Sequence, residues 1–334
     1  MTLIPVINLV AVQSRMERSD YHDSDVFAAK IGSLMQQVGR KADLSLPTLV
    51  AFPELIGMFL SFVPRYWEEL REEASLEPAA MKIVTQNFAS LSEKHRATPE
   101  AAARRLLFVD TAIETEAIYT GIFSTLAQEY GCYIAAGSIA LPPMEAEPSK
   151  GGRHIVDDTR VYNTAYLFSP RGVCLSRTPK VNLVPGFEER VFDPAPVSAT
   201  VPVNTAIGRI GTLVCFDGFH ETLVERYDAM GVQLLLKPSY NQHPWDGPST
   251  YDPEHREGEK WLDEGCPSII QGRENIRYGV NAMLVGGVFD DMYAEGLSSV
   301  SVNTGRPGAS WEEGVISIAS RPDAEEIVAA TVEL

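Results

Sequence analysis

Residues 210–221 read IGTLVCFDGFHE, and this stretch combines a strand, a glycine-containing turn and the start of a helix. The apolar run 210–215 is typical of a strand that is covered on both faces. Residues 216–218 predict a turn, and a helix is expected to begin near His220. Such a corner exposes one side chain, directs backbone N–H groups at a developing oxyanion and favours a thiolate. The stretch therefore predicts an α/β fold with Cys215 at a nucleophile elbow, although a buried cysteine that packs as a small hydrophobe gives the same pattern.

Comparable strands recur along the chain and alternate with helical patterns. The expected strands are short apolar runs at 4–13, 48–52, 133–139, 161–168, 172–177, 232–236, 278–289 and 298–302. The expected helices lie at 26–38, across much of 62–130 and at 219–230. Two strands end alike, because Leu49 to Pro53 precedes Glu54 and Leu234 to Pro238 precedes Ser239. This similarity predicts two related halves packed face to face, with functional residues where the strands end.

The composition limits the classes of protein and of partner. The chain has 334 residues, 45% hydrophobic and 22% charged, as in globular proteins. Its net charge of -17 disfavours a nucleic-acid partner. The four cysteines form no CxxC pair, so neither a zinc cluster nor a disulfide framework is expected, and a reducing compartment fits best. The apolar N-terminal run lacks the features of a signal peptide, and no stretch approaches the roughly 20 apolar residues of a membrane span. We therefore expect a cytoplasmic protein without a membrane partner.

Three short motifs occur in a fixed order along the chain. Residues 52–54 read FPE, residues 179–180 read PK before the run VNLVP, and residues 215–221 read CFDGFHE. Together they resemble the three motifs of the nitrilase (carbon-nitrogen hydrolase) superfamily. Further segments that are similar to the family are AVQ at 11–13, AAGS at 135–138 and YNTAYLFSPRG at 162–172. The resemblance thus covers nearly the whole chain.

The resemblance implies a role for each motif residue. Cys215 is expected to be the nucleophile, Glu54 the general base and Lys180 the group that stabilises the tetrahedral intermediate. A cysteine with a pKa near ~8.5 is only a few per cent thiolate at neutral pH, so a base and a nearby cation both help it to react. The family often places a second glutamate on the loop after the lysine, and aligning the loop favours Glu189, with Glu188 as the alternative. No metal or organic cofactor is needed.

The resemblance also implies the architecture. We expect the family's four-layer α-β-β-α sandwich as a single domain over 1–334, commonly paired into a homodimer or a higher homo-oligomer. Three segments look larger than the family's core requires, namely 62–130, 142–160 and 246–270. They are expected to be insertions or loops at the pocket mouth or at the oligomer contact.

The substrate is expected to be a small molecule with an amide or carbamoyl group. Phe216-Asp217 after the cysteine resembles the amidase and carbamoylase branches, whereas PGFEERVF at 185–192 leans towards nitrilases that act on a nitrile. Phe216 is a further candidate contact, with Tyr240, Asn241 and Trp245 after the next strand, where ordinary aromatic packing is an equal alternative. The lysine at 237 is unusual for such a strand end.

Other readings of the same residues stay open. His220 is the histidine nearest to Cys215 in the sequence, so a Cys-His dyad is a minor alternative. A catalytically silent ligand-binding or assembly module has the same fold without the reaction. Acyl transfer is a third possibility, in which an amine replaces water.

Overall fold

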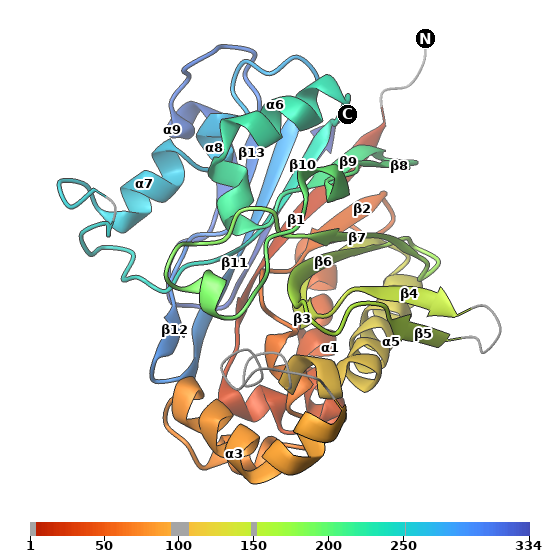
Figure 1. The fold of residues 1–334 in the computed structure, drawn as a ribbon. Coiled ribbons are helices and arrows are strands. Elements are labelled where there is room, and N and C mark those ends of the chain that lie inside the picture. Colours follow the sequence, from red (N-terminus) through yellow and green to blue (C-terminus); the bar gives the residue numbers. More distant parts are fainter. Residues whose placement is uncertain (1–4, 95–106, 148–151, 251) are drawn as a thin grey trace.

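Two β-sheets packed face to face, with helices on both outer faces, form the molecule (Figure 1). The computed structural model describes residues 5–94, 107–147, 152–250 and 252–334. The predicted four-layer α-β-β-α sandwich is confirmed.

The first sheet has the strand order β7-β6-β3-β2-β1-β15. Its strands are β7 (Cys174–Pro179), β6 (Tyr162–Phe168), β3 (Tyr133–Leu141), β2 (Thr48–Ala51), β1 (Val6–Arg15) and β15 (Glu326–Glu333). The central strands β1, β2 and β3 are parallel, while β6, β7 and β15 are added antiparallel. β2 is buried at every position and is followed directly by the FPE motif, as its continuous apolar run predicts.

The second sheet has the strand order β8-β9-β10-β11-β13-β14. Its strands are β8 (Val203–Thr205), β9 (Gly208–Thr212), β10 (Leu234–Tyr240), β11 (Tyr278–Phe289), β13 (Ser299–Val302) and β14 (Val315–Ile318), and the short β12 (Met292–Ala294) pairs with the end of β11. The end of β1, Ser14 and Arg15, pairs in parallel with Leu284 and Val285 of β11 and so joins the two sheets.

Helices cover the outer face of each sheet (Figure 1). The α-helices are α1 (Ser24–Lys41), α2 (Trp67–Arg71), α3 (Leu76–Lys94), α5 (Ala112–Tyr130), α6 (Glu221–Ala229), α7 (Glu257–Asp263), α8 (Cys266–Ile269) and α9 (Trp311–Gly314). The 3-10 helices are η1 (Arg18–Tyr21), η2 (Met58–Ser61), η3 (Glu188–Arg190), η4 (Val197–Ala199) and η5 (Cys215–Phe219). α1 and α5 pack on the first sheet, and α6 and α8 pack on the second. No helix in the described ranges has the length and apolar character to cross a bilayer.

The core between the sheets is built from alternating strand residues that point inward. The first sheet contributes Ile7, Leu9, Ala11, Leu49, Ala51, Tyr133, Ala135, Leu167, Val328 and Val332, and the second sheet contributes Ile210, Leu234, Leu236, Val280, Ala282 and Val300. Burial of about ten such large aliphatic side chains at ~1.5–3 kcal/mol each makes this interface a main source of stability.

Several segments differ from the sequence-based expectation. The stretch 142–160 was expected to be an exposed loop, but its described part contains the antiparallel strands β4 (Met144–Glu147) and β5 (Gly152–Ile155). The segment 246–270 was expected to be a loop, yet it contains α7 and α8. The helical prediction for 62–130 holds for α2, α3 and α5, and residues 95–106 lie outside the described ranges.

Candidate active site

Cys215 occupies the turn between β9 and α6. The expected strand 210–215 ends earlier, at Thr212, and Cys215 begins η5 with a positive φ of 49°. Such a backbone conformation is costly for a residue with a side chain and is typical of a nucleophile elbow. Its thiol is 3% exposed and donates a hydrogen bond to the carbonyl oxygen of Tyr240, at 3.4 Å. The elbow geometry predicted from the sequence is therefore present.

Asp217 joins this elbow to the segment that carries Lys180. Its buried carboxylate accepts the backbone N–H of Val181 at 3.0 Å and that of Asn182 at 2.6 Å. The sequence did not predict this structural role of Asp217. The sequence feature that could have indicated this role is an acidic side chain in a short apolar turn, because such a carboxylate needs hydrogen-bond donors when it is buried.

Glu54 lies just past β2, on a turn that β3 holds. The following residue, Leu55, has a positive φ of 59°, and its N–H donates to Ser138 Oγ at 2.8 Å. The pairing of β3 with β6 shifts register between Ala135 and Ser138, which brings Gly137 against the turn. A Cβ atom on Gly137 would lie 2.0 Å from the carbonyl oxygen of Pro53. Only glycine fits there, so this irregular part of β3 sets the position of Glu54.

Lys180 follows β7 and lies between two buried carboxylates. Its Nζ is 2.8 Å from Glu54 Oε1 and 2.6 Å from Glu188 Oε2. Asn163 Nδ2 donates a second hydrogen bond to Glu54 Oε1, at 2.7 Å. All three charged side chains are at most 3% exposed, so the ammonium is held by charge-assisted hydrogen bonds in a site with little water.

The second glutamate in the site is Glu188 rather than Glu189. Both lie in η3, but neighbouring residues of a tight turn point in different directions. Glu188 is buried, and its Oε2 also accepts the N–H of Val184 at 2.8 Å. Glu189 is exposed and accepts the N–H of Gly186 at 3.1 Å. The expectation for Glu189 is therefore corrected: the alternative residue occupies this position.

Burial and charge shift the protonation of the three central groups. Burial raises the pKa of Glu54 to about 7, with Lys180 opposing and Glu188 reinforcing the shift. Burial alone would lower the pKa of Lys180, but Glu54, Cys215 and Glu188 together raise it. Burial and the neighbouring Glu54 raise the pKa of the Cys215 thiol well above its usual range, which corrects the expectation that the elbow favours a thiolate. At neutral pH the sulfur therefore keeps its proton and Lys180 keeps its charge, while Glu54 can either accept or donate a proton.

Lys237, which the sequence left without explanation, lies behind the elbow. Its Nζ stands 3.9 Å from the ring centroid of Phe219 and 4.2 Å from that of Trp261, and it makes no hydrogen bond within the described part of the chain. Its stem packs on Gly218, where a Cβ would lie 2.7 Å from the lysine carbons. Burial lowers the pKa of Lys237 to about 8. Both aromatic rings line the pocket, whereas Lys237 itself does not.

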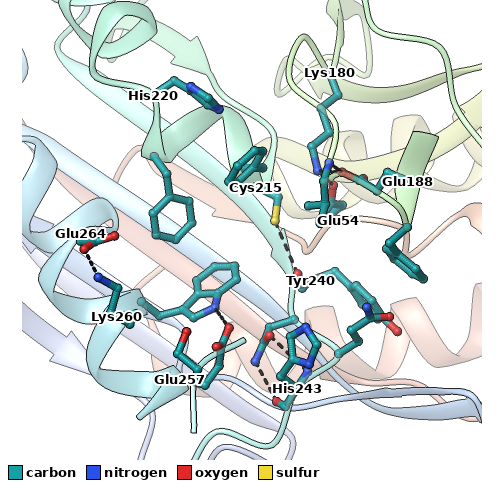
Figure 2. A pocket seen from close by; sticks show the side chains of 18 residues that line it. Glu54, Lys180, Glu188, Cys215, His220, Tyr240, His243, Glu257, Lys260 and Glu264 are labelled. Atoms are coloured by element: carbon teal, nitrogen blue, oxygen red, sulfur yellow. Dashed lines mark hydrogen bonds and ion pairs between the residues drawn. The ribbon is translucent and has the colours of Figure 1, made fainter. Parts of the chain in front are cut away.

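One pocket brings these groups together (Figure 2). Its lining residues are Glu54, Lys180, Val184, Phe187, Glu188, Cys215, Phe216, Phe219, His220, Tyr240, Asn241, Gln242, His243, Ser249, Glu257, Lys260, Trp261 and Glu264. The predicted contacts Phe216, Tyr240 and Asn241 are among them. In the described ranges, no group of three or more His, Cys, Asp or Glu side chains is arranged to hold a metal ion.

Trp245 and His220 were both considered as site residues from the sequence, and of these two His220 lines the pocket. Trp245 does not line the pocket, because it packs against Gly258 and the ring of Trp261. His220 does line it, and its ring lies edge-on to Phe216. The Nε2 atom of His220 has no hydrogen-bond partner within the described residues, so no Cys-His pair is formed there.

Comparison with known proteins identifies the family. A family model described as carbon-nitrogen hydrolase matches residues 11–257. The chain belongs to the carbon-nitrogen hydrolase family. This result also confirms the resemblance to the nitrilase superfamily that the motifs carried.

Solved structures similar to this carbon-nitrogen hydrolase share its fold. Nit3 of Saccharomyces cerevisiae, a member of branch 10 of the nitrilase superfamily, is 17% identical with a TM-score of 0.58, covering 98% of this chain and 90% of that one. The carbon-nitrogen hydrolase of Helicobacter pylori G27 is 16% identical with a TM-score of 0.60, covering 99% and 90%. The amidase NitN of Nesterenkonia sp. AN1 is 16% identical with a TM-score of 0.54, covering 98% and 92%. A mutant of that amidase carries acrylamide added at its active-site cysteine.

One curated relative carries a different activity in its name. Apolipoprotein N-acyltransferase of Geobacter metallireducens is 30% identical over an alignment of 142 positions that covers 34% of this chain. The match spans only 27% of that acyltransferase, so most of the relative has no counterpart in the alignment.

Proposed function

We propose that this carbon-nitrogen hydrolase cleaves the amide or carbamoyl bond of a small molecule through a thioester on Cys215. The observation that carries the proposal is the meeting of Cys215, Glu54 and Lys180 on one pocket, although they lie on three separate turns. Family membership and the fold shared with the Nesterenkonia amidase support the reaction class.

The pKa values of the site suggest the order of proton movements. As Cys215 Sγ attacks the carbonyl carbon, its proton passes to Glu54, and the carbonyl oxygen becomes an oxyanion. Lys180 and the Phe216 N–H stabilise this oxyanion, and each such donor is typically worth roughly 3 kcal/mol of barrier. The tetrahedral intermediate collapses when Glu54 gives its proton to the leaving nitrogen, which departs as ammonia or an amine. Water, deprotonated by Glu54, then hydrolyses the thioester and returns the thiol.

Glu188 acts by positioning in this scheme. It is a second anion in contact with the Lys180 ammonium, besides Glu54, so that the cation stays in place when Glu54 becomes neutral.

The experiment is a search for ammonia release from parallel panels of amides, carbamoyl compounds and nitriles. We expect turnover of an amide or carbamoyl compound, a mass increase of one acyl group on the protein, and loss of both in Cys215→Ala. Cys174→Ala is the matched control, because this half-buried cysteine lies on β7 and does not line the pocket. Release from nitriles alone would assign the chain to the nitrilase activity instead.

Acyl transfer is the second candidate, favoured by the likeness to the Geobacter acyltransferase. The thioester would be the same, but an amine rather than water would attack it, forming a new amide and returning the thiol. Adding a primary amine to the assay separates the two, because a transferase yields the new amide in preference to the free acid. If no panel gives either product or an acyl-protein, the catalytically silent binding module is the correct reading.

A further inference from the structure

Glu257 is a buried pocket residue whose carboxylate is only half satisfied. It is the first residue of α7, lines the pocket and is 5% exposed. Its Oε1 accepts the indole N–H of Trp261 at 2.9 Å. Its Oε2 is buried and has no hydrogen-bond partner within the described part of the chain. Leaving a buried carboxylate oxygen unpaired costs several kcal/mol, so such an atom calls for an explanation.

The surrounding backbone fixes this carboxylate in place. The N–H of Glu257 donates to the carbonyl oxygen of Gly247, and the N–H of Gly258 donates to that of Trp245, both at 2.9 Å. Gly258 lies so close to the Trp245 ring that a Cβ there would stand 2.4 Å from its Nε1 atom. The first turn of α7 is thus pinned at two successive positions, which holds Glu257 at the pocket wall.

The charges of the pocket are paired except at this residue. Four carboxylates and two ammonium groups line it, namely Glu54, Glu188, Glu257, Glu264, Lys180 and Lys260. Lys180 is paired with Glu54 and Glu188, and Lys260 with Glu264 and with Asp252. No ion pair among the described residues includes Glu257. Lys237 does not supply the missing partner, because its Nζ makes no hydrogen bond to any described residue and packs on the Trp261 ring.

The lining of the pocket that holds Glu257 and the thiol is mainly apolar. Five aromatic side chains contribute to it, namely Phe187, Phe216, Phe219, Tyr240 and Trp261. Figure 2 shows Glu257 on the opposite side of the pocket from Glu54, Lys180 and Cys215. A molecule that spans the pocket therefore meets the thiol at one end, apolar surface in the middle and a carboxylate at the other end.

We propose that Glu257 binds a cationic nitrogen at the end of the substrate remote from the bond that is cleaved. The ligand class is an aliphatic amide or carbamoyl compound with a terminal primary ammonium group. This assignment rests on the proposed function of Cys215 for its orientation. The ammonium would give Glu257 Oε2 its missing donor and bring the positive charge that the lining lacks.

The test uses ω-amino-alkanamides of increasing chain length. Each is paired with the unsubstituted alkanamide of the same length and with the corresponding monoamide of a dicarboxylic acid. At the best length we expect kcat/KM to be about 10- to 100-fold higher for the ammonium compound than for the neutral one, since a hydrogen bond to a charged group has that effect. The terminal carboxylate should be the poorest substrate.

The variant Glu257→Gln keeps the acceptor for Trp261 and removes the charge. We expect it to lose the ammonium preference, mainly through KM, so that it hydrolyses the ammonium and neutral amides with similar kcat/KM. Glu259→Gln is the control: this exposed residue lies on the same helix outside the pocket, and glutamine preserves its capping bond to the Arg256 N–H. Equal losses for both substrates in Glu257→Gln would show a structural role and overturn the assignment.

Calorimetric binding to the Cys215→Ala protein separates this inference from the reaction itself. The ω-amino-alkanamide should bind about 10-fold or more tightly than the neutral amide even though neither is cleaved. If the ammonium compound binds more tightly but the wild type cleaves neither amide, the proposed reaction is contradicted and the cation site is not. If the wild type cleaves both amides without preferring the ammonium compound, or if neither amide binds, the cation site is contradicted.

Discussion

At the scale of single residues, the site is a small network in which each charge depends on its neighbours. Lys180 bridges two carboxylates that would otherwise repel each other, and Asn163 adds a donor to Glu54. Removing one member of such a buried network leaves the others unpaired, which costs more than the lost contact. Substitutions of neighbouring glutamates should therefore have very different effects.

The pair Glu188→Gln and Glu189→Gln tests which glutamate belongs to the network. We expect the first to lower kcat about 100-fold or more, because the Lys180 ammonium loses one of its two anions, and a misplaced cation no longer stabilises the oxyanion. The second removes a charge from an exposed side chain and should leave kcat within about twofold of the wild type. Amide hydrolysis at saturating substrate measures both, and equal losses would contradict the placement of Glu188.

The raised pKa of Glu54 predicts an acid limit to activity. Only the ionised carboxylate can accept the thiol proton, and burial places the pKa of Glu54 at about 7. The value of kcat/KM should therefore fall about tenfold per pH unit below that point and approach a plateau above it. A pH profile that stays flat down to pH ~5 would rule out Glu54 as the base.

Lys237 predicts a dependence of stability on pH with a definite sign. The pKa of this lysine is about 8 in the folded chain, against 10.5 for an ordinary lysine. Below pH ~8 both states carry the proton and the cost of burying the charge is fully present. Between pH ~8 and ~10.5 the unfolded state binds more protons, so the cost disappears as the pH rises.

Lys237→Met should accordingly stabilise the protein at pH ~7, and the gain should shrink towards pH ~10. The lowered pKa of Lys237 corresponds to a gain of at most about 3 kcal/mol in the free energy of unfolding. Loss of the two contacts between the ammonium and the rings offsets up to about 2 kcal/mol of this gain. Urea unfolding at several pH values measures the difference. Lys41→Met, at an exposed lysine, should show no such trend, and a gain that did not change with pH would contradict the buried charge.

At the scale of elements, two turns with unusual backbone geometry hold the reacting groups. Cys215 and Leu55 are the non-glycine residues with positive φ among those described, and each lies at or beside a group of the site. The sequence predicted both turns, because a buried strand stops at a motif in each case. It favoured Glu189 over Glu188 and was wrong, since the direction of a side chain in a 3-10 turn depends on the phase of the turn. It also proposed Trp245 as a substrate contact, with aromatic packing as the equal alternative, because the sequence does not show that α7 packs on this ring.

Gly137→Ala tests whether β3 positions Glu54. Gly137 has a φ of 76°, and an added Cβ would lie 2.0 Å from the Pro53 carbonyl oxygen. We expect a loss of about 2 kcal/mol or more in the free energy of unfolding, together with lost activity as the FPE turn moves. Gly121→Ala on the exposed face of α5 meets no atom within 4 Å and should be neutral or stabilising by up to about 1 kcal/mol. Full activity in Gly137→Ala would contradict this role.

At the scale of the whole molecule, the two sheets depend on one another. β1 pairs with β2 and β15 in one sheet and with β11 of the other, and the inward faces share one core. The paired layers were predictable because strand motifs recur in both halves. β14 and β15 were missed: β15 contains the apolar run IVAATV at 327–332, but both strands are only partly buried, and a short apolar run alone predicts a strand only weakly. Assembly into a homodimer stays a prediction, which light scattering measures.

Leu9→Ala tests whether the chain is a single domain. Leu9 is fully buried between the sheets, so its truncation should cost about 2–5 kcal/mol. If the chain unfolds as one unit, circular dichroism and the fluorescence of the tryptophans beside the pocket should shift to the same lower midpoint. Val6→Ala, at an exposed site on the same strand, should shift neither by much. Separate transitions would show two domains.

The raised pKa of Cys215 has a consequence for the durability of the protein. Peroxide and other oxidants attack thiolates far faster than thiols. A nucleophile that keeps its proton until a carbonyl group arrives offers such reagents little to react with. The empty pocket should therefore withstand oxidative stress that would inactivate an enzyme with a permanently ionised cysteine.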